Sequence, residues 1–171
     1  LMSTIGGLAP WIYERDLSGA WSQLEVFQPA ASFVDQLPFV PDSAALFTSY
    51  QDTSQVVTSD ARLRVIGRKD PTFGMFYVQN TTGTWAAILR DGQTPESVGG
   101  TVTLLNMQPS TMYSVFWFDT DSGSVIANVN VLSDCDGNLG LTMPQDITQS
   151  VAAMLYPAFS WCPPHPRRRR R

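Results

Sequence analysis

The residues of this chain that could do chemistry are few and lie far apart in the sequence. The single histidine, His165, stands between prolines, so the spacing indicates no pairing with a serine or cysteine nucleophile. The sequence DCDGN at residues 134–138 resembles a calcium loop, but Gln145 stands where the EF-hand pattern has glutamate. We therefore predict an Asp-Gly hairpin turn at 134–138, no metal and no cofactor, with a calcium site shared between two loops as the alternative.

Two cysteines and one sequon are the remaining reactive features. Cys135 and Cys162 can form a disulfide between a hairpin and the C-terminal tail, and two free buried thiols are the alternative. Asn80, followed by Thr81-Thr82, is an N-glycosylation sequon. The sequon favours an extracellular or cell-wall protein.

Aromatic residues are numerous enough to suggest carbohydrate contact, because exposed aromatic faces stack on sugar rings. Six aromatic residues are candidates for such contact: Phe76, Tyr77, Trp85, Phe116, Trp117 and Trp161. Packing in the core or at a domain interface is the default for each. Trp85 is the candidate for contact with polysaccharide, although a glycan on Asn80 would hinder a sugar-binding face beside it.

The clearest structural signal is residues 112–118, where apolar side chains fill both faces of a strand. Tyr113 and Trp117 share one face, and Phe116 and Phe118 share the other. An Asp-Ser-Gly turn and a second strand follow at once, which predicts a β-hairpin in the middle of a sandwich. We expect one face in the core and the other under a loop or a neighbouring domain.

Short strands at even spacing predict an antiparallel β-sandwich of eight strands beyond Asp60. They are expected near 62–68, 73–80, 84–89, 100–106, 112–118, 124–132, 138–143 and 150–156. Before them, apolar residues recur every three or four positions from Leu17 to Leu37, which predicts a helix. Pro29 either breaks this helix or begins a second segment at its first turn.

The net charge of −4 conceals an acidic body. Five of the eleven basic residues form the run 167–171, which leaves six basic against fifteen acidic residues, a net charge of −9. Such a body repels phosphate backbones, so we expect no nucleic-acid partner. We expect no membrane span either, because no apolar run approaches about 20 residues. The arginine run follows a proline-rich stretch and indicates a disordered tail or a sequence artefact.

Several motifs, in order and spacing, resemble the C-terminal region of glycoside hydrolases in which a (β/α)8 barrel precedes a small β-sandwich. The motifs are 63–67 (LRVIG), 76–80 (FYVQN), Thr84-Trp85, 113–123 (YSVFWFDTDSG) and 137–144 (GNLGLTMP). The first forty residues are similar to the end of the barrel: 2–11 to its eighth strand and loop, and 17–37 to its eighth helix. The resemblance covers the chain up to about Tyr156.

The resemblance implies that the chain is the C-terminal end of a longer protein, with the two catalytic carboxylates on earlier barrel strands and no catalytic residue here. Trp11 takes the place of an aromatic that lines the sugar subsite in such proteins, and core or interface packing is its alternative role. Glu14 and Asp16 lie near Trp11, but adjacent loop carboxylates are usually solvated, so neither is assigned to catalysis.

The implied organisation is the last strand and helix of a barrel at 1–41, a connector at 42–60, a β-sandwich at 61–157 and a Pro/Arg-rich tail at 158–171. The expected function is that of a non-catalytic ancillary β-sandwich of an extracellular glycoside-hydrolase-like protein. Its partners would be the rest of the barrel or neighbouring copies, and polysaccharide. Alternatives are a structural subunit of an extracellular fibre or cell wall, and a free-standing carbohydrate-binding module.

Overall fold

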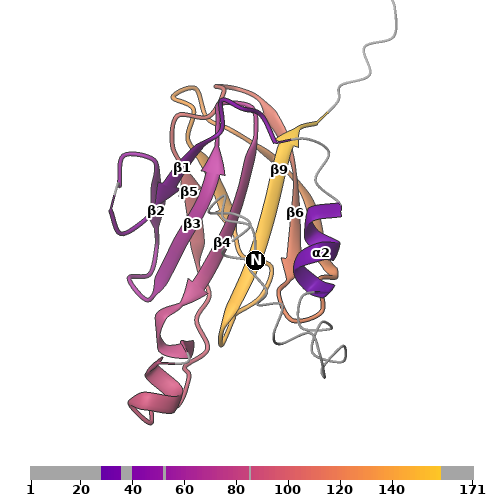
Figure 1. Cartoon of the computed structure of the whole chain (residues 1–171). Coiled ribbons are helices and arrows are strands. Elements are labelled where there is room, and N and C mark those ends of the chain that lie inside the picture. Colours follow the sequence, from indigo (N-terminus) through magenta and orange to yellow (C-terminus); the bar gives the residue numbers. More distant parts are fainter. Residues whose placement is uncertain (1–27, 36–39, 52, 85, 159–171) are drawn as a thin grey trace, which may run out of the picture.

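A computed structural model describes residues 28–35, 40–51, 53–84 and 86–158 of the 171-residue chain. This part of the chain is mainly β, and nine strands form two antiparallel sheets with a shared core between them (Figure 1). The larger sheet has six strands in the order β1-β3-β4-β9-β6-β7, and the smaller has three in the order β2-β5-β8. The mainly β sandwich predicted from the sequence is confirmed in outline.

The larger sheet consists of β1 (Ala45–Thr48), β3 (Leu63–Lys69), β4 (Gly74–Asn80), β6 (Met112–Asp119), β7 (Val125–Leu132) and β9 (Ser150–Pro157). The smaller sheet consists of β2 (Val56–Thr58), β5 (Thr101–Leu104) and β8 (Leu139–Thr142). The helical elements within the described residues are α2 (Gln28–Asp35), the 3₁₀ turn η3 (Thr81–Gly83) and the π-helical turn η4 (Ala86–Arg90).

The core lies between the two sheets because every second side chain of the central strands points inward. In β6, Tyr113 and Trp117 are buried and belong to this core, as predicted. The ring of Trp117 meets that of Phe76 edge to face, with centroids 5.7 Å apart. Such aromatic pairs add specific geometry to the burial of a large apolar surface.

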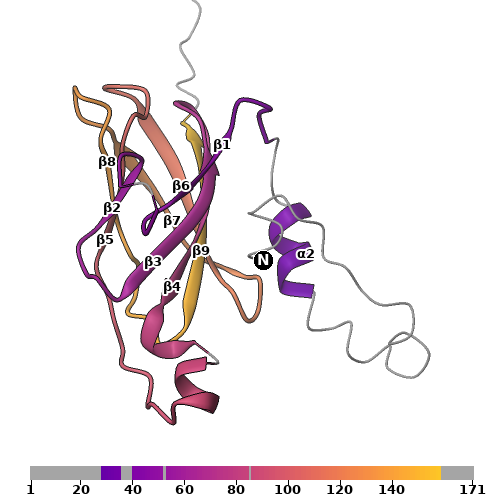
Figure 2. The same ribbon diagram turned by 60° about the vertical axis from the view of Figure 1, so that its left-hand side comes forward.

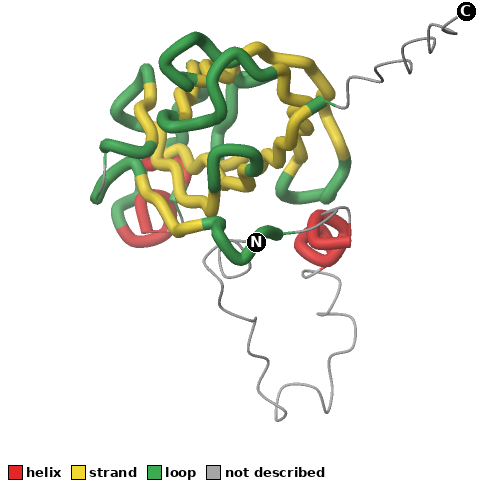
Figure 3. The backbone as a smooth tube through the Cα atoms, turned by 90° about the horizontal axis from the view of Figure 1, so that it is seen from above, coloured by secondary structure: helices red, strands yellow, loops and turns green. Residues whose placement is uncertain are grey.

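A second apolar layer lies on the outer face of the six-stranded sheet. Figure 2 shows the smaller sheet on one side of the large sheet and α2 on the other, and Figure 3 shows α2 outside the ring of strands. Phe33 of α2 is buried against Phe118 of β6, with ring centroids 5.0 Å apart and planes at 85°. Met75 and Met154 extend this layer across the sheet. The second face of β6 is therefore covered, as its sequence predicts.

Helix α2 contains Pro29 in its first turn. This position suits proline because the first turn of a helix leaves its N–H groups without intrahelical partners. Pro29 thus occupies the first turn of the described helix, a position that the sequence analysis allows. The rest of the predicted helix before Gln28, and the predicted barrel strand, lie outside the described residues.

Two parts of the strand prediction are wrong. The expected connector contains β1 and β2, which pair with β3 and β5. The expected strand at 84–89 is instead the helical turn η4, where the Thr84 Oγ1 accepts a hydrogen bond of 3.1 Å from the N–H of Ala87. Residues of good helix propensity follow this cap, and the local preference prevails there.

Candidate functional site

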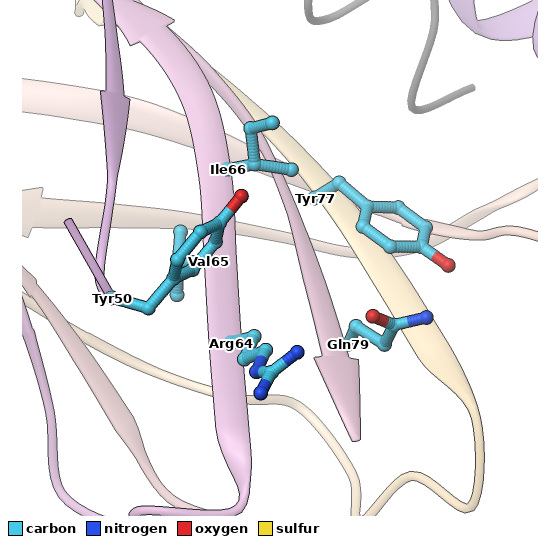
Figure 4. Close-up of a pocket in the computed structure, with 6 residues that line it drawn as sticks. All are labelled: Tyr50, Arg64, Val65, Ile66, Tyr77 and Gln79. Atoms are coloured by element: carbon cyan, nitrogen blue, oxygen red, sulfur yellow. The ribbon is translucent and has the colours of Figure 1, made fainter. Parts of the chain in front are cut away.

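A small hollow of about 90 Å³ opens to solvent on the outer face of the six-stranded sheet (Figure 4). It is lined by Tyr50, Arg64, Val65, Ile66, Tyr77 and Gln79. Val65 belongs to the inner core and contributes to the hollow from the sheet surface, whereas its neighbours Arg64 and Ile66 face outward.

The pairing of β3 with β4 brings four of these residues together. Arg64 lies directly opposite Gln79, and Ile66 lies directly opposite Tyr77. Opposite residues of an antiparallel pair project from the same face, with Cβ atoms about 5 Å apart. The register therefore places a guanidinium and an amide side by side, next to an aliphatic and an aromatic side chain.

Tyr50 reaches the hollow from the turn after β1. Ser49 holds this turn against β3 with two hydrogen bonds of 2.9 Å, one from its N–H to the Val65 carbonyl and one from the Val65 N–H to its hydroxyl. The guanidinium carbon of Arg64 lies 5.6 Å from the centroid of the Tyr50 ring, a cation–π geometry. Tyr50 is 54% exposed, so part of its surface stays available to a ligand.

The side chains that line the hollow supply hydrogen-bonding groups and aromatic surface. Burial raises the pKa of Tyr77, partly offset by a hydrogen bond with Ser150, so its phenol stays protonated at neutral pH and can donate. The described residues that line the hollow include no carboxylate, imidazole or thiol. A guanidinium, an amide and two phenols beside aromatic surface suit a neutral, hydroxyl-rich ligand.

Sequence reasoning identified Tyr77 as an aromatic of interest and missed the hollow itself. Tyr50 lies in the segment expected to be a connector, and no local pattern shows that it returns to β3. The residues predicted to contact sugar, Trp11 and Trp85, lie outside the described residues. The same holds for Glu14, Asp16, His165 and Cys162.

The predicted glycosylation site is buried. Asn80 has 0% exposure, and its Nδ2 donates to the carbonyls of Glu96, Ile147 and Thr148 at 2.6, 3.2 and 3.2 Å. Its Oδ1 accepts from the N–H and the hydroxyl of Thr82, at 3.0 and 2.9 Å. A glycan on Nδ2 would have to displace these contacts, so the folded structure leaves no place for it. The sequon residues instead cap a turn and tie three segments together.

The segment at 134–138 is a turn held by Asp134. Its Oδ1 accepts from the N–H of Asp136 and Asn138 at 2.9 and 2.7 Å, and Gly137 has a φ of +78°. The turn joins β7 to β8, which lie in different sheets, so it is a turn as predicted but not a hairpin within one sheet. Among the described residues, no cluster of three or more acidic, histidine or cysteine side chains forms a metal site. Cys135 is exposed and forms no disulfide with another described residue.

Hydrogen-bonded aspartates make the stability of this fold sensitive to acid. Bonds from Arg62 lower the pKa of Asp60 to about 2, and bonds from Ser122 and Asn138 lower the pKa of Asp119 and Asp134, respectively. A carboxyl whose folded pKa is depressed stabilises the native state above its unfolded pKa, and this stability is lost as pH falls through the folded pKa. The urea midpoint should therefore fall between about pH 5 and about pH 2. Asp119→Asn should flatten this dependence, and an unchanged slope would contradict the assignment.

The described part of the chain has no helix of the length and apolar character needed to cross a membrane. The chain matches no protein-family model and no curated protein sequence.

Proposed function

We propose that this chain is a non-catalytic ancillary β-sandwich from an extracellular glycoside-hydrolase-like protein. In this role it stabilises a neighbouring (β/α)8 barrel and contacts polysaccharide. The observation that carries the proposal is the second apolar layer on the outer face of the six-stranded sheet, with α2 packed on it. A sandwich that only had to fold by itself would need apolar side chains on the inner face alone.

Helix α2 supports the barrel part of the proposal. It falls within residues 17–37, the range that resembles the eighth helix of the barrel. Phe33 is 1% exposed and contacts the sheet, so this segment and the sandwich already share a packed interface. A helix that belongs to a barrel on one side and to the sandwich on the other would join the two domains rigidly.

The hollow supports the polysaccharide part of the proposal. It lies beside the α2-covered layer on the same sheet face, and Tyr77 borders both. Its side chains offer donors, acceptors and an exposed ring, which are the groups that a sugar with hydroxyls and an apolar ring face requires. A polysaccharide bound in the hollow would therefore lie next to the barrel to which the sandwich is attached.

Affinity electrophoresis in gels containing soluble polysaccharides tests the contact. We expect the 171-residue chain to be retarded by one of them, and Tyr50→Ala to weaken the binding about tenfold, or about 1.4 kcal/mol. Leu89→Ala is the matched control, because Leu89 is 80% exposed and is not among the residues that line the hollow. Equal retardation of wild type and Tyr50→Ala would place the contact elsewhere.

A hydrolysis assay tests the non-catalytic part separately. The chain should release no reducing sugar from the polysaccharide that retards it, because the described residues that line the hollow include no carboxylate. Hydrolysis that copurifies with the chain and disappears in Glu14→Gln would overturn the proposal.

A further inference from the structure

The free edge of β7 lacks most of the features that usually block pairing, and its one irregularity lies near Ile126. β7 ends the six-stranded sheet, and within the described residues it pairs with β6 alone. Its eight residues, VIANVNVL, contain no charge and no proline. Natural sheets usually protect such edges with charged residues, proline, bulges or short length. The opposite edge, β1, has only four residues.

Apolar side chains are exposed on both faces of this edge: Val129 lies on the core side, whereas Leu132 and its partner Met112 lie on the outer face. Val129 is 43% exposed and Leu132 is 58% exposed, and Met112, opposite Leu132 on β6, is 42% exposed. A register shift lies between Trp117 and Phe118 of β6, so the irregular part of β7 is near Ile126. From Ala127 onward the strand is regular and available for pairing.

We propose that β7 pairs antiparallel with β7 of a second copy of this chain, joining the two large sheets across a twofold axis. The sequence is self-complementary in this arrangement. A pairing centred on Val129 puts Val129 opposite itself, Ala127 opposite Val131, and Asn128 opposite Asn130. Apolar side chains thus meet apolar ones on the core side, and amides meet amides on the other face.

The occupant is a second copy because this pattern matches itself and carries no charge that would require a complementary partner. A twofold contact uses the same patch on both subunits, which is the commonest form of homo-oligomer. A single strand-to-strand contact buries little surface, so the dimer should be weak and concentration-dependent. The proposed function concerns the hollow beside β3 and β4 and the face under α2. Pairing through the free edge of β7 does not depend on it.

Sedimentation equilibrium of the 171-residue chain over about a hundredfold range of concentration tests the pairing. The mass should rise from 18.9 kDa towards twice that value as concentration increases. Val129→Lys should keep the monomer mass throughout, since an inward-pointing charge at a strand edge opposes pairing. Val57→Lys is the matched control, because Val57 is 48% exposed on β2 of the other sheet.

Hydrogen exchange provides a readout that does not depend on a variant. The amides of residues 127–131 should exchange more slowly at high than at low concentration of the unmodified chain, while those of β2 should not change. A monomer mass at every concentration would overturn the proposal. So would a dimer that Val57→Lys disrupts as strongly as Val129→Lys, or a dimer in which residues 127–131 gain no protection.

Discussion

Replacing Asn80 with alanine should lower the free energy of unfolding by about 3 kcal/mol or more, because several buried polar groups would lose their partners. The Nδ2 of Asn80 donates to three carbonyls, and its Oδ1 accepts two bonds from Thr82. The side chain has 0% exposure, so water cannot replace these bonds without rearrangement. Each buried group left unsatisfied costs about 1–3 kcal/mol.

The effect should be large because Asn80 holds three segments that are distant in sequence. It ends β4, and its partners lie at Glu96 and in the turn before β9. Gly83 packs against the same segment, since a Cβ at that position would clash with the Thr148 carbonyl oxygen. Loss of Asn80 would therefore loosen a junction that the backbone itself packs closely.

Thr82→Ala is the decisive control, because it destroys the sequon as completely as Asn80→Ala does. It removes the hydroxyl bond to Oδ1 and the bond that the hydroxyl accepts from the Glu96 N–H, and it keeps the three bonds from Nδ2. We therefore expect a loss of about 1–2 kcal/mol. Urea unfolding of both variants, made in a host that glycosylates secreted proteins, separates the two roles. If Asn80 acted through a glycan, the two variants would lose equal stability, and the wild type would carry the mass of a sugar chain.

The sequence predicted the elements whose pattern is local. Tyr113 and Trp117 were expected on one face of a strand and Phe116 and Phe118 on the other, and the structure confirms both faces. The turn at 134–138 was predicted from its Asp136-Gly137 pair, and in the structure Asp134, three residues before Gly137, accepts the hydrogen bonds that hold it. Alternation and turn chemistry are properties of neighbouring residues, so they can be recognised without the fold.

The features that the sequence did not predict depend on register between distant segments. β1 has four residues, and only its pairing with β3 makes it part of the sheet. The hollow exists because that pairing brings Tyr50 to Arg64, fourteen positions along the chain. The sequon at Asn80 favoured an exposed glycan, but whether such an asparagine is buried depends on carbonyls at Glu96 and Ile147.

The second prediction concerns the layer that carries the proposed function. Phe33→Ala should destabilise the fold by about 3–5 kcal/mol, the range for removal of a buried aromatic side chain. Phe33 is 1% exposed and contacts Phe118 edge to face, so the substitution would leave a cavity between α2 and the sheet. Urea unfolding measures the loss, and binding of a dye that fluoresces on apolar surfaces should increase when α2 no longer covers β6.

Leu46→Ala is the control for this prediction. Leu46 lies on β1 of the same sheet and is 55% exposed, so its loss should change the free energy of unfolding by less than about 0.5 kcal/mol. If Phe33→Ala behaved like this control, the outer face would not depend on its helix. The sheet would then need no cover, and the argument that this face is built to pack against a neighbouring barrel would fail. A large loss confined to Phe33→Ala would mean that α2 is an integral part of the sandwich, as a helix shared between two domains must be.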